Sequence, residues 1–223
     1  MTTHDEIARS LQARWPEHRV GPSLVRIKAL TELLGHPEDS CPVIQITGTN
    51  GKGSTAIMIE TLLLALGLRV GRYSSPHLSD LTERICIDGV PIGADRFDDL
   101  VADVMPLVEL VDAERHDGIP MTFFEVMTGL AYAAFAEAPV DVAVVEVGLG
   151  GSWDATSVCT PAVAVLCPID VDHAHLLGAT PDIIAVEKAG IIKEGSVAVV
   201  AAQSAGVARV IAERAGEVGA RVV

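Results

Sequence analysis

The sequence predicts an α/β fold: a doubly wound, mostly parallel sheet with flanking helices. The first observation is a set of near-continuous apolar runs, the kind found in strands that are covered on both faces. The second is that helical patterns alternate with these runs. The third is the segment 82–91, in which Ile85, Ile87 and the pair Asp88-Gly89 predict a small hairpin beside the main sheet.

The individual elements follow from local patterns. The expected strands occupy residues 43–47, 142–147, 162–167 and 197–201. The expected helices occupy residues 54–66, 97–111, 123–137, 181–189 and 206–215. The fourth helix is clearly delimited, because Thr180 can cap its start, Pro181 suits the first helical position and Gly190 follows its end. The last residues, 219–223, look like the start of another strand.

Length and composition indicate a globular chain. It has 223 residues, of which 49% are hydrophobic and 21% charged, so it can bury a core and is not intrinsically disordered. No linker divides it, and we expect one domain. The longest charge-free stretch, 155–169, contains two prolines and is shorter than the roughly 18 apolar residues of a membrane helix. The first residues show no basic region followed by an apolar one, so no secretory signal is expected.

Charge and cysteine usage narrow the partners and the location. Acidic residues outnumber Lys and Arg by 30 to 16, for a net charge of −14. Such a field repels polyanions, so we expect no nucleic-acid partner, whereas local cations can still hold a small anion. The four cysteines, Cys41, Cys86, Cys159 and Cys167, have no CxxC spacing. Buried free thiols are expected for Cys159 and Cys167, and with them a cytoplasmic location.

A glycine-rich loop, Thr-Gly-Thr-Asn-Gly-Lys-Gly-Ser-Thr at 47–55, joins the first strand to its helix. Its glycines let the backbone turn N–H groups toward an anion, and the positive end of the helix points to the same place. Lys52 adds a full charge, and the hydroxyl of Ser54 or Thr55 can reach a phosphate-bound Mg²⁺. The general GxxxxGKS/T pattern does not match, because Gly53 separates the lysine from the hydroxyl. The alternative is a glycine-rich turn with an incidental lysine.

One carboxylate, Glu146, ends an otherwise apolar strand just before a second glycine-rich segment. In open α/β sheets, ligands bind outside the carboxyl ends of the strands. A buried, unpaired carboxylate is costly, and Mg²⁺ with oxygen ligands would satisfy it. The structural alternative is an ion pair between Glu146 and a nearby Lys or Arg.

Four polar side chains follow the third expected strand: Asp170, Asp172, His173 and His175. Two carboxylates and two imidazoles at a strand terminus are unusual as core residues, so we expect one of them to ligate a metal or to support its ligands. A solvated polar turn is the alternative. Lys188 lies in the last turn of its helix, where a lysine is favourable to the helix dipole without any further role.

Several short segments form a recognisable series along the chain. They are ThrGlyThrAsnGlyLysGlySer at 47–54, TyrSerSerProHisLeu at 73–78, GluArgIle at 83–85, PheGlu at 124–125, GluValGlyLeuGlyGly at 146–151, AspAlaThr at 154–156, AspHis at 172–173, LeuGly at 177–178 and GluLysAlaGlyIle at 187–191, with Lys193 and Gly195. This series resembles the folylpolyglutamate synthase/dihydrofolate synthase family, a branch of the ATP-dependent Mur-type ligases. It runs in the family's order over nearly the whole chain, and it implies a nucleotide-binding P-loop fold like the central domain of Mur ligases.

The resemblance implies a nucleotide and metal site. The ATP-binding residues are then Thr49, Asn50, Gly51, Lys52, Gly53, Ser54 and Thr55. The ligands of Mg²⁺, as one ion or two, are then Ser54, Ser75, Glu146, His173 and Lys188, the lysine as a carbamate. Carbamate formation requires a neutral amine that reacts with CO₂, and hence a lysine with a lowered pKa. Lys52, His173 and Lys188 are the catalytic residues that the resemblance implies.

The resemblance also implies a pteroate or folate site. Its residues are then Pro22, Ser23, Leu24, Val25, Thr122, Phe123, Phe124, Glu125, Trp153, Asp154 and Ala155. The aromatic rings offer flat surfaces for a pterin or benzoyl group, although burial in the core suits the two phenylalanines equally well. Two positions depart from the family: Ser152 stands where an Arg is frequent, and Ser157 replaces an Asn. These departures affect substrate preference more than ATP binding.

The activity implied is an ATP-dependent amide ligase that adds L-glutamate to dihydropteroate or reduced folates through an acyl phosphate. Two alternatives remain: another Mur-type amino-acid ligase, or an ATP-binding module without catalysis. SerSerProHisLeu and GluLysAlaGlyIle favour the folate branch. Family members continue into a Rossmann-like domain, so residues 1–223 would be an incomplete ATP-binding ligase domain and a poor catalyst alone. A monomer is expected, and the sequence leaves open whether the first glutamate, later ones or both are added.

Overall fold

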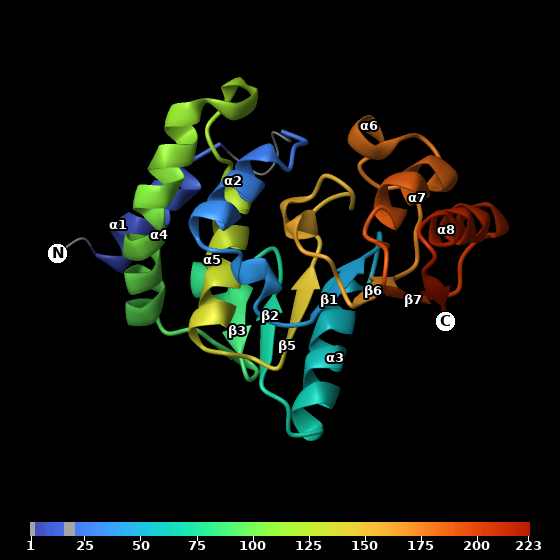
Figure 1. Cartoon of the computed structure of the whole chain (residues 1–223), viewed down its shortest axis with the longest axis horizontal. Coiled ribbons are helices and arrows are strands. Elements are labelled where there is room, and N and C mark those ends of the chain that lie inside the picture. Colours follow the sequence, from blue (N-terminus) through green and yellow to red (C-terminus); the bar gives the residue numbers. More distant parts are fainter. Residues whose placement is uncertain (1–2, 16–20) are drawn as a thin grey trace.

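Eight strands form one sheet in the order β4-β3-β2-β5-β1-β6-β7-β8 (Figure 1). The computed structural model describes residues 3–15 and 21–223. The strands are β1 (Val43–Thr47), β2 (Val70–Tyr73), β3 (Ile85–Ile87), β4 (Val90–Pro91), β5 (Val142–Glu146), β6 (Val163–Leu166), β7 (Val197–Val200) and β8 (Arg221–Val222). The six strands from β2 to β8 in this order are parallel, whereas β3 and β4 add to β2 in antiparallel fashion.

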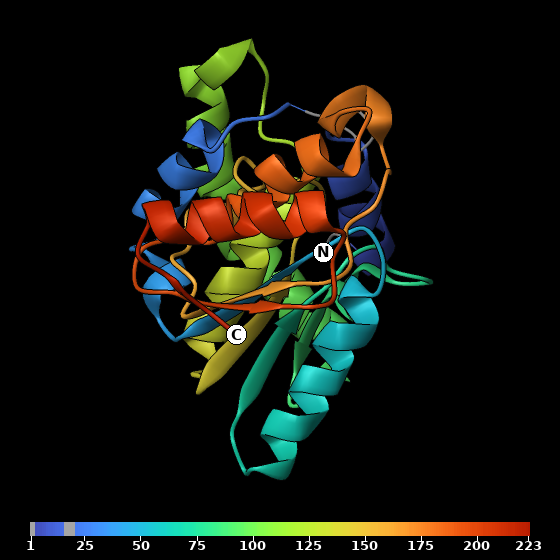
Figure 2. The ribbon, with the colours of Figure 1, turned by 90° about the vertical axis from the view of Figure 1, so that its right-hand side faces the viewer.

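Helices cover the two faces of the sheet unequally. The α-helices are α1 (His4–Gln12), α2 (Val25–Leu33), α3 (Lys52–Ala65), α4 (Ala94–Glu114), α5 (Phe123–Glu137), α6 (Ala174–Leu177), α7 (Pro181–Ala189) and α8 (Ala205–Glu217). Four short 3-10 turns are η1 (Pro37–Asp39), η2 (Leu81–Arg84), η3 (His116–Gly118) and η4 (Ala155–Val158). Figure 2 shows α7 and α8 above the strands and α3 below them.

Alternating side chains of the same strands supply both cores, as a strand with a period of two requires. Ala143 and Val145 of β5 pack into a large cluster with α2, α4 and α5, while Val142 and Val144 pack with α3. Leu166 of β6 belongs to a third cluster with α7 and α8. The sheet is therefore buried on both faces at its centre.

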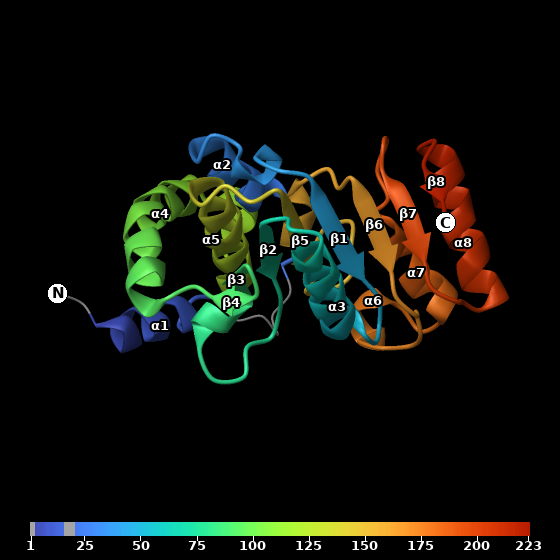
Figure 3. The same ribbon diagram turned by 90° about the horizontal axis from the view of Figure 1, so that it is seen from below.

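The winding of the chain explains the unequal cover. Parallel crossovers are right-handed, so connections in opposite directions along the sheet lie on opposite faces. Among the crossovers between parallel strands, only the β1–β2 connection, through α3, runs toward the β4 edge. The later crossovers run the other way, and their helices lie on the opposite face. Figure 3 shows β6 and β7 open to view on the side of α3, and Val199 on β7 is 40% exposed.

The outer face of α3 is apolar as well. Ile57, Met58, Leu62 and Leu66 are 52%, 57%, 66% and 77% exposed. The acidic residue of this helix, Glu60, is buried and pairs with Arg72 of β2 at 2.7 Å, so it contributes no charge to that face. A helix that is apolar all round is normally covered on all sides.

Most predicted elements are confirmed, and α5 and α7 match the expected ranges 123–137 and 181–189 residue for residue. The helix expected at 54–66 begins earlier, at Lys52, because Gly51 with φ of 81° already serves as its N-cap. The expected strand near the end of the chain is β8. The hairpin predicted beside the sheet is instead part of it, since β3 pairs with β2.

Four of the α-helices and strands that the structure describes were not predicted: β2, α1, α2 and the short α6. The strand β2 has the sequence Val-Gly-Arg-Tyr, whose glycine and arginine interrupt the apolar pattern. Arg72 is accommodated because its Nε donates to Glu60 and its Nη1 to Ser74, each at 2.7 Å. This strand carries the chain to Ser75 at the same edge of the sheet as Glu146.

Candidate functional site

The carboxyl ends of β1, β5 and β6 meet at one edge of the sheet, because β1 pairs in parallel with both neighbours. Ile46 lies opposite Glu146, and Thr47 lies opposite Leu166. From β1 the chain connects to β2 on one side of β1, and β6, β7 and β8 are added later on its other side. This edge is therefore the switch point at which open α/β sheets bind ligands.

The loop after β1 passes against the segment that follows β6. A Cβ on Gly48, whose φ is 151°, would lie 2.5 Å from Cβ of Cys167, so no side chain fits there. The N–H of Thr49 donates to the carbonyl of Pro168 at 3.0 Å. The Thr49 hydroxyl donates to the Asp170 carbonyl at 2.8 Å and accepts from the Asp170 N–H at 3.0 Å. The loop is thus fixed at the amino end of α3, the position that favours an anion.

Two lysines share one carbonyl in this loop. Nζ of Lys52 donates to Gly48 O at 3.2 Å, and Nζ of Lys188 donates to the same oxygen at 3.1 Å. Lys188 is 4% exposed. Its burial, and next the positive charge of Lys52, lower the pKa of Lys188 from 10.5 to about 8. The structure therefore brings residues from α3 and α7, far apart in sequence, to one point beside the loop.

Glu146 lies on the other side of the loop and is 4% exposed. Burial raises the pKa of this carboxyl group, and the charge of Lys52 opposes the increase. The N–H of Ser75 donates to Glu146 Oε2 at 3.4 Å. A Cβ on Gly53 would lie 3.5 Å from the same oxygen. Ser75, Glu146 and the start of α3 are therefore neighbours, as their assignment to one metal site requires.

The segment after β6 brings the Asp172 carboxylate within electrostatic range of Lys188. The charge of Asp172 acts on Lys188 and raises its pKa, against the larger effect of burial. His173 adopts a left-handed conformation with φ of 48°, and its exposed ring lies 3.6 Å from Asp172 Oδ2. His175 is also exposed, in α6. The ligand role of His173 remains a prediction.

The segment 122–125 forms the start of α5. Thr122 and Glu125 make a capping box, with Thr122 N donating to Glu125 Oε2 at 2.7 Å and Glu125 N donating to Thr122 Oγ1 at 3.1 Å. Glu125 also accepts from Nε of Arg26 at 3.1 Å, and both side chains are buried. Thr122 and Glu125 thus have structural partners within the fold.

The two phenylalanines of this segment differ in exposure and in the side chains that they contact. Phe123 is 5% exposed, and the guanidinium carbon of Arg84 lies 4.9 Å from its ring centroid. Phe124 is half-buried, with its ring centroid 5.9 Å from that of Tyr73. A Cβ on Gly148 would lie 2.5 Å from the Phe124 ring, so this ring packs directly on the loop after β5. Phe124 is therefore the more exposed of the two residues.

The remaining predicted pteroate residues lie in two segments, one that enters η4 and one that enters α2. Trp153 is half-buried, whereas Asp154 and Ala155 are 4% and 5% exposed. Burial raises the pKa of Asp154 to about 6, and its carboxylate accepts from Leu149 N at 2.9 Å. In the segment 22–25, Leu24 is the N-cap of α2, Ser23 Oγ accepts from Val25 N at 3.1 Å, and Pro22 is exposed.

Glu187 contacts the site, although no role of its own was assigned to it from the sequence. Its carboxylate accepts hydrogen bonds from the loop that carries Trp153. It stands beside Lys188 in the sequence, but a lone glutamate in a helix gives no local signal of such a contact. Gln45 was also missed: a polar residue within an apolar strand, fully buried, whose amide donates to Thr156 and Ser157 at 3.0 and 2.9 Å.

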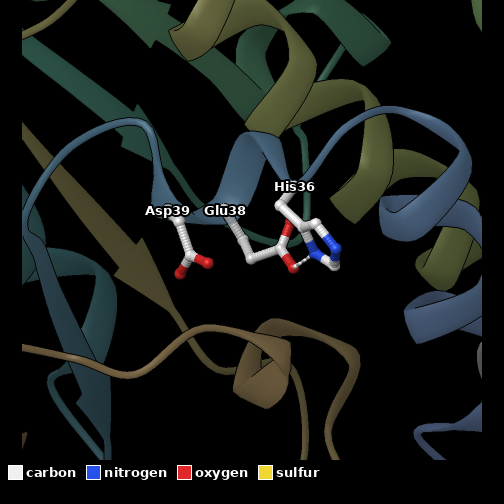
Figure 4. Close-up of side chains that lie close together, drawn as sticks. All are labelled: His36, Glu38 and Asp39. Atoms are coloured by element: carbon white, nitrogen blue, oxygen red, sulfur yellow. Dashed lines mark hydrogen bonds and ion pairs between the residues drawn. The ribbon is translucent and has the colours of Figure 1, made fainter.

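A second group of polar side chains lies at η1, before β1, and so at the opposite edge of the sheet. His36, Glu38 and Asp39 each offer one possible ligand atom, within 4.8 Å of one another. Nδ1 of His36 and Oε1 of Glu38 are 3.1 Å apart, and Figure 4 shows these two side chains meeting while the Asp39 carboxylate lies to the other side of Glu38. We interpret the pair as stabilising the turn.

The site at the switch point defines a class of protein. A glycine-rich loop before a helix, two lysines and a buried carboxylate at that place are typical of α/β domains that bind phosphate groups. Among the described residues, no helix is long and apolar enough to cross a membrane. No protein-family model matches the chain.

Comparison with known proteins identifies the family. Dihydrofolate synthase/folylpolyglutamate synthase of Mycobacterium tuberculosis is 52% identical over 201 residues, which cover 85% of this chain and 41% of that protein. Folylpolyglutamate synthase of Lacticaseibacillus casei is 46% identical, over 76% of this chain and 40% of its own length. The chain belongs to the dihydrofolate synthase/folylpolyglutamate synthase family, and it spans about two fifths of the length of these relatives.

Solved structures agree with this assignment. Mycobacterium tuberculosis folylpolyglutamate synthase complexed with ADP superposes with a TM-score of 0.93 at 46% identity, over 99% of this chain and 49% of that one. A folylpolyglutamate synthase complex with AMPPCP and folate gives a TM-score of 0.92 at 38% identity, over 99% of this chain and 53% of the other. The mostly parallel sheet with its flanking helices is therefore the fold of the matched part of these enzymes.

Proposed function

We propose that this chain is the nucleotide-binding part of an ATP-dependent ligase that adds L-glutamate to dihydropteroate or to reduced folates. The observation that carries the proposal is the meeting of Lys52, Lys188 and Glu146 around the Gly48 loop at the switch point. Relatives solved with ADP, or with AMPPCP and folate, support the same substrates for this chain. The chain spans about two fifths of its relatives, so the activity is proposed for a protein of their length.

In the proposed reaction, a carboxylate oxygen of the pteroate or folate attacks the γ-phosphorus of ATP. ADP leaves, and an acyl phosphate forms. The amino group of glutamate then attacks the acyl carbon, phosphate leaves and the amine loses a proton. This chemistry needs no covalent enzyme intermediate, so the protein contributes position and charge. Lys52 and the N–H groups at the start of α3 would bind the phosphate oxygens.

The residues at this edge fit a divalent cation. Glu146 is buried, and the contact that satisfies one of its oxygens is a long one, from Ser75 N–H at 3.4 Å. Carboxylate and hydroxyl oxygens are the ligands that Mg²⁺ prefers, so Glu146, Ser54 and Ser75 would hold it, with His173 and the carbamate of Lys188 as further ligands. When bound, Mg²⁺ would neutralise charge on the phosphate oxygens.

Carbamylation of Lys188 is part of the proposal. A pKa of about 8 leaves a useful fraction of the amine neutral near pH 7.5. The neutral nitrogen attacks the carbon of CO₂ and loses a proton, which leaves a carbamate anion. Equilibration with carbon-13 bicarbonate should give a carbamate signal in carbon NMR. The signal should be absent from Lys188→Ala and retained in Lys28→Ala, whose lysine is exposed on α2.

The decisive experiment is glutamate-dependent ADP production by the full-length protein, with dihydropteroate and tetrahydrofolate offered separately. Lys52→Ala should abolish ADP production with an unchanged circular dichroism spectrum, and Lys28→Ala should retain it. Ligation at the normal rate by Lys52→Ala would remove the phosphate role of this loop. Activity with a UDP-linked peptide precursor would point to another Mur-type ligase, and ATP binding without ADP production would point to a non-catalytic module.

A further inference from the structure

We infer that the Glu187 carboxylate is a positioning group, which fixes the loop 150–153 on α7 and keeps the Trp153 side of the site in register with the phosphate loop. The part of the inference that concerns pteroate rests on the proposed function. The part that concerns the loop rests on the contacts of Glu187 alone.

Glu187 binds three consecutive residues of the loop. Its Oε1 accepts from Gly151 N at 3.2 Å, from Trp153 N at 3.3 Å and from the Ser152 hydroxyl at 2.7 Å. Its Oε2 accepts from the same hydroxyl at 2.8 Å. The Glu187 carbonyl accepts from Ser152 N at 3.2 Å. One residue therefore takes the N–H groups of Gly151, Ser152 and Trp153.

The loop 150–153 packs closely against α7. A Cβ on Gly151 would lie 2.6 Å from the Glu187 carbonyl oxygen and 2.9 Å from Cα of Lys188. From the other side, the Thr47 hydroxyl at the end of β1 donates to Gly150 O at 2.9 Å. The segment 150–153 is thus held between β1 and α7, and on the α7 side the charged acceptor is Glu187. Hydrogen bonds to a charged acceptor are roughly twice as strong as neutral ones.

The same turn of α7 reaches the phosphate loop. Lys188, the next residue, donates to Gly48 O at 3.1 Å. Trp153, Glu187, Lys188 and Gly48 therefore form a continuous series of contacts from the predicted pteroate loop to the predicted ATP loop. Ser152, which stands where the family frequently has an Arg, takes part in this series through its hydroxyl group.

The first test measures the loop in this chain by amide hydrogen exchange. Glu187→Ala should increase exchange of the Gly151 and Trp153 N–H groups on the order of tenfold, because about 1.4 kcal/mol of protection is lost with the charged acceptor. The Ser152 N–H keeps its acceptor, the Glu187 carbonyl, and should change less. Glu187→Gln, which keeps one neutral acceptor oxygen, should be intermediate. Glu194→Ala removes the same charge from an exposed position shortly after α7 and should leave exchange unchanged. Equal exchange in Glu187→Ala and Glu194→Ala would overturn the inference.

The second test separates positioning from general stability. In a Trp15→Phe background Trp153 is the sole tryptophan, since the chain has two. Glu187→Ala should shift the Trp153 emission and weaken dihydropteroate affinity on the order of tenfold, with the affinity for AMPPCP unchanged. The positioning role would be overturned if Glu187→Ala lowered the affinities for dihydropteroate and AMPPCP equally. It would also be overturned if amide exchange became faster while the dihydropteroate affinity stayed unchanged. If the unaltered chain binds AMPPCP but no dihydropteroate, the proposed substrate fails, and exchange and emission still decide the loop contact.

Discussion

Replacing Lys188 by Met removes a buried charge and keeps much of the side-chain volume. In the folded protein the pKa of Lys188 is about 8, against 10.5 for an exposed lysine. At about 1.4 kcal/mol per pH unit, this difference makes the charged lysine cost about 3 kcal/mol of stability at pH 7. Met loses one hydrogen bond to Gly48 O, worth about 1 kcal/mol, but Lys52 still donates to that oxygen at 3.2 Å. We expect Lys188→Met to raise the free energy of unfolding at pH 7 by about 2 kcal/mol.

The cost of burying the charged Lys188 depends on pH in a definite direction. Between pH 8 and 10.5 the unfolded chain holds a proton on Lys188 that the folded chain has released. The unfolded state therefore binds more protons in this window, and the contribution of Lys188 to stability rises with pH. Below pH 8 the full cost is present, and above about pH 10.5 it is absent. The advantage of Lys188→Met should accordingly shrink across this window.

Urea unfolding at pH 7, 8, 9 and 10 measures this directly, in buffers freed of CO₂ so that the amine is not carbamylated. Lys28→Met, at an exposed position, is the control and should be within about 0.5 kcal/mol of the unaltered chain at each pH. A destabilised Lys188→Met at pH 7, or an advantage that stays constant from pH 7 to 10, would refute the assigned cost of burial.

Three further changes test other parts of the structure. Gly48→Ala should abolish AMPPCP binding in calorimetry and lower the free energy of unfolding by about 2 kcal/mol or more. Gly216→Ala, with open space around it in α8, should be neutral or stabilising. AMPPCP binding by Gly48→Ala would contradict the close packing of the loop. Arg26→Ala should destabilise by about 3–5 kcal/mol in urea unfolding because it leaves the buried Glu125 unpaired, and a loss below about 1 kcal/mol would be inconsistent with that pair. Leu62→Lys, on the exposed apolar face of α3, should leave the free energy of unfolding within about 0.5 kcal/mol of that of the unaltered chain, because the side chain is 66% exposed; a loss above about 1 kcal/mol in urea unfolding would show that Leu62 packs against the fold.

Local signals account for the elements that the sequence predicted well. Thr180 and Pro181 delimit α7, and the capping box of Thr122 and Glu125 marks the start of α5. The same kind of signal, Thr3 with Glu6, starts α1 and was overlooked. The strand β2 gave no comparable signal, because its glycine and arginine are made acceptable only by the partners that the fold supplies.

Some residues of the candidate site could likewise be predicted from local patterns, whereas the contacts among them could not. Lys52 and Glu146 could be placed from their positions at strand ends, because parallel strands bring those ends to one edge. Which atoms meet there depends on register and on the approach of α7, and neither is written in a local pattern. The shared contact of Lys52 and Lys188 with Gly48 O, and the hold of Glu187 on the loop, arise only once distant segments pack together.

The carbonyl of Gly48 keeps two ammonium groups close together within a molecule whose net charge is −14. The net charge of the chain repels anions, whereas two neighbouring ammonium groups would attract them locally at this end of the strands for as long as Lys188 is not carbamylated. Long polyanions meet the repulsion over their whole length, whereas a compact anion meets only the local excess of positive charge. An anion bound beside both ammonium groups would relieve their mutual repulsion, so its binding would add to the stability of the domain.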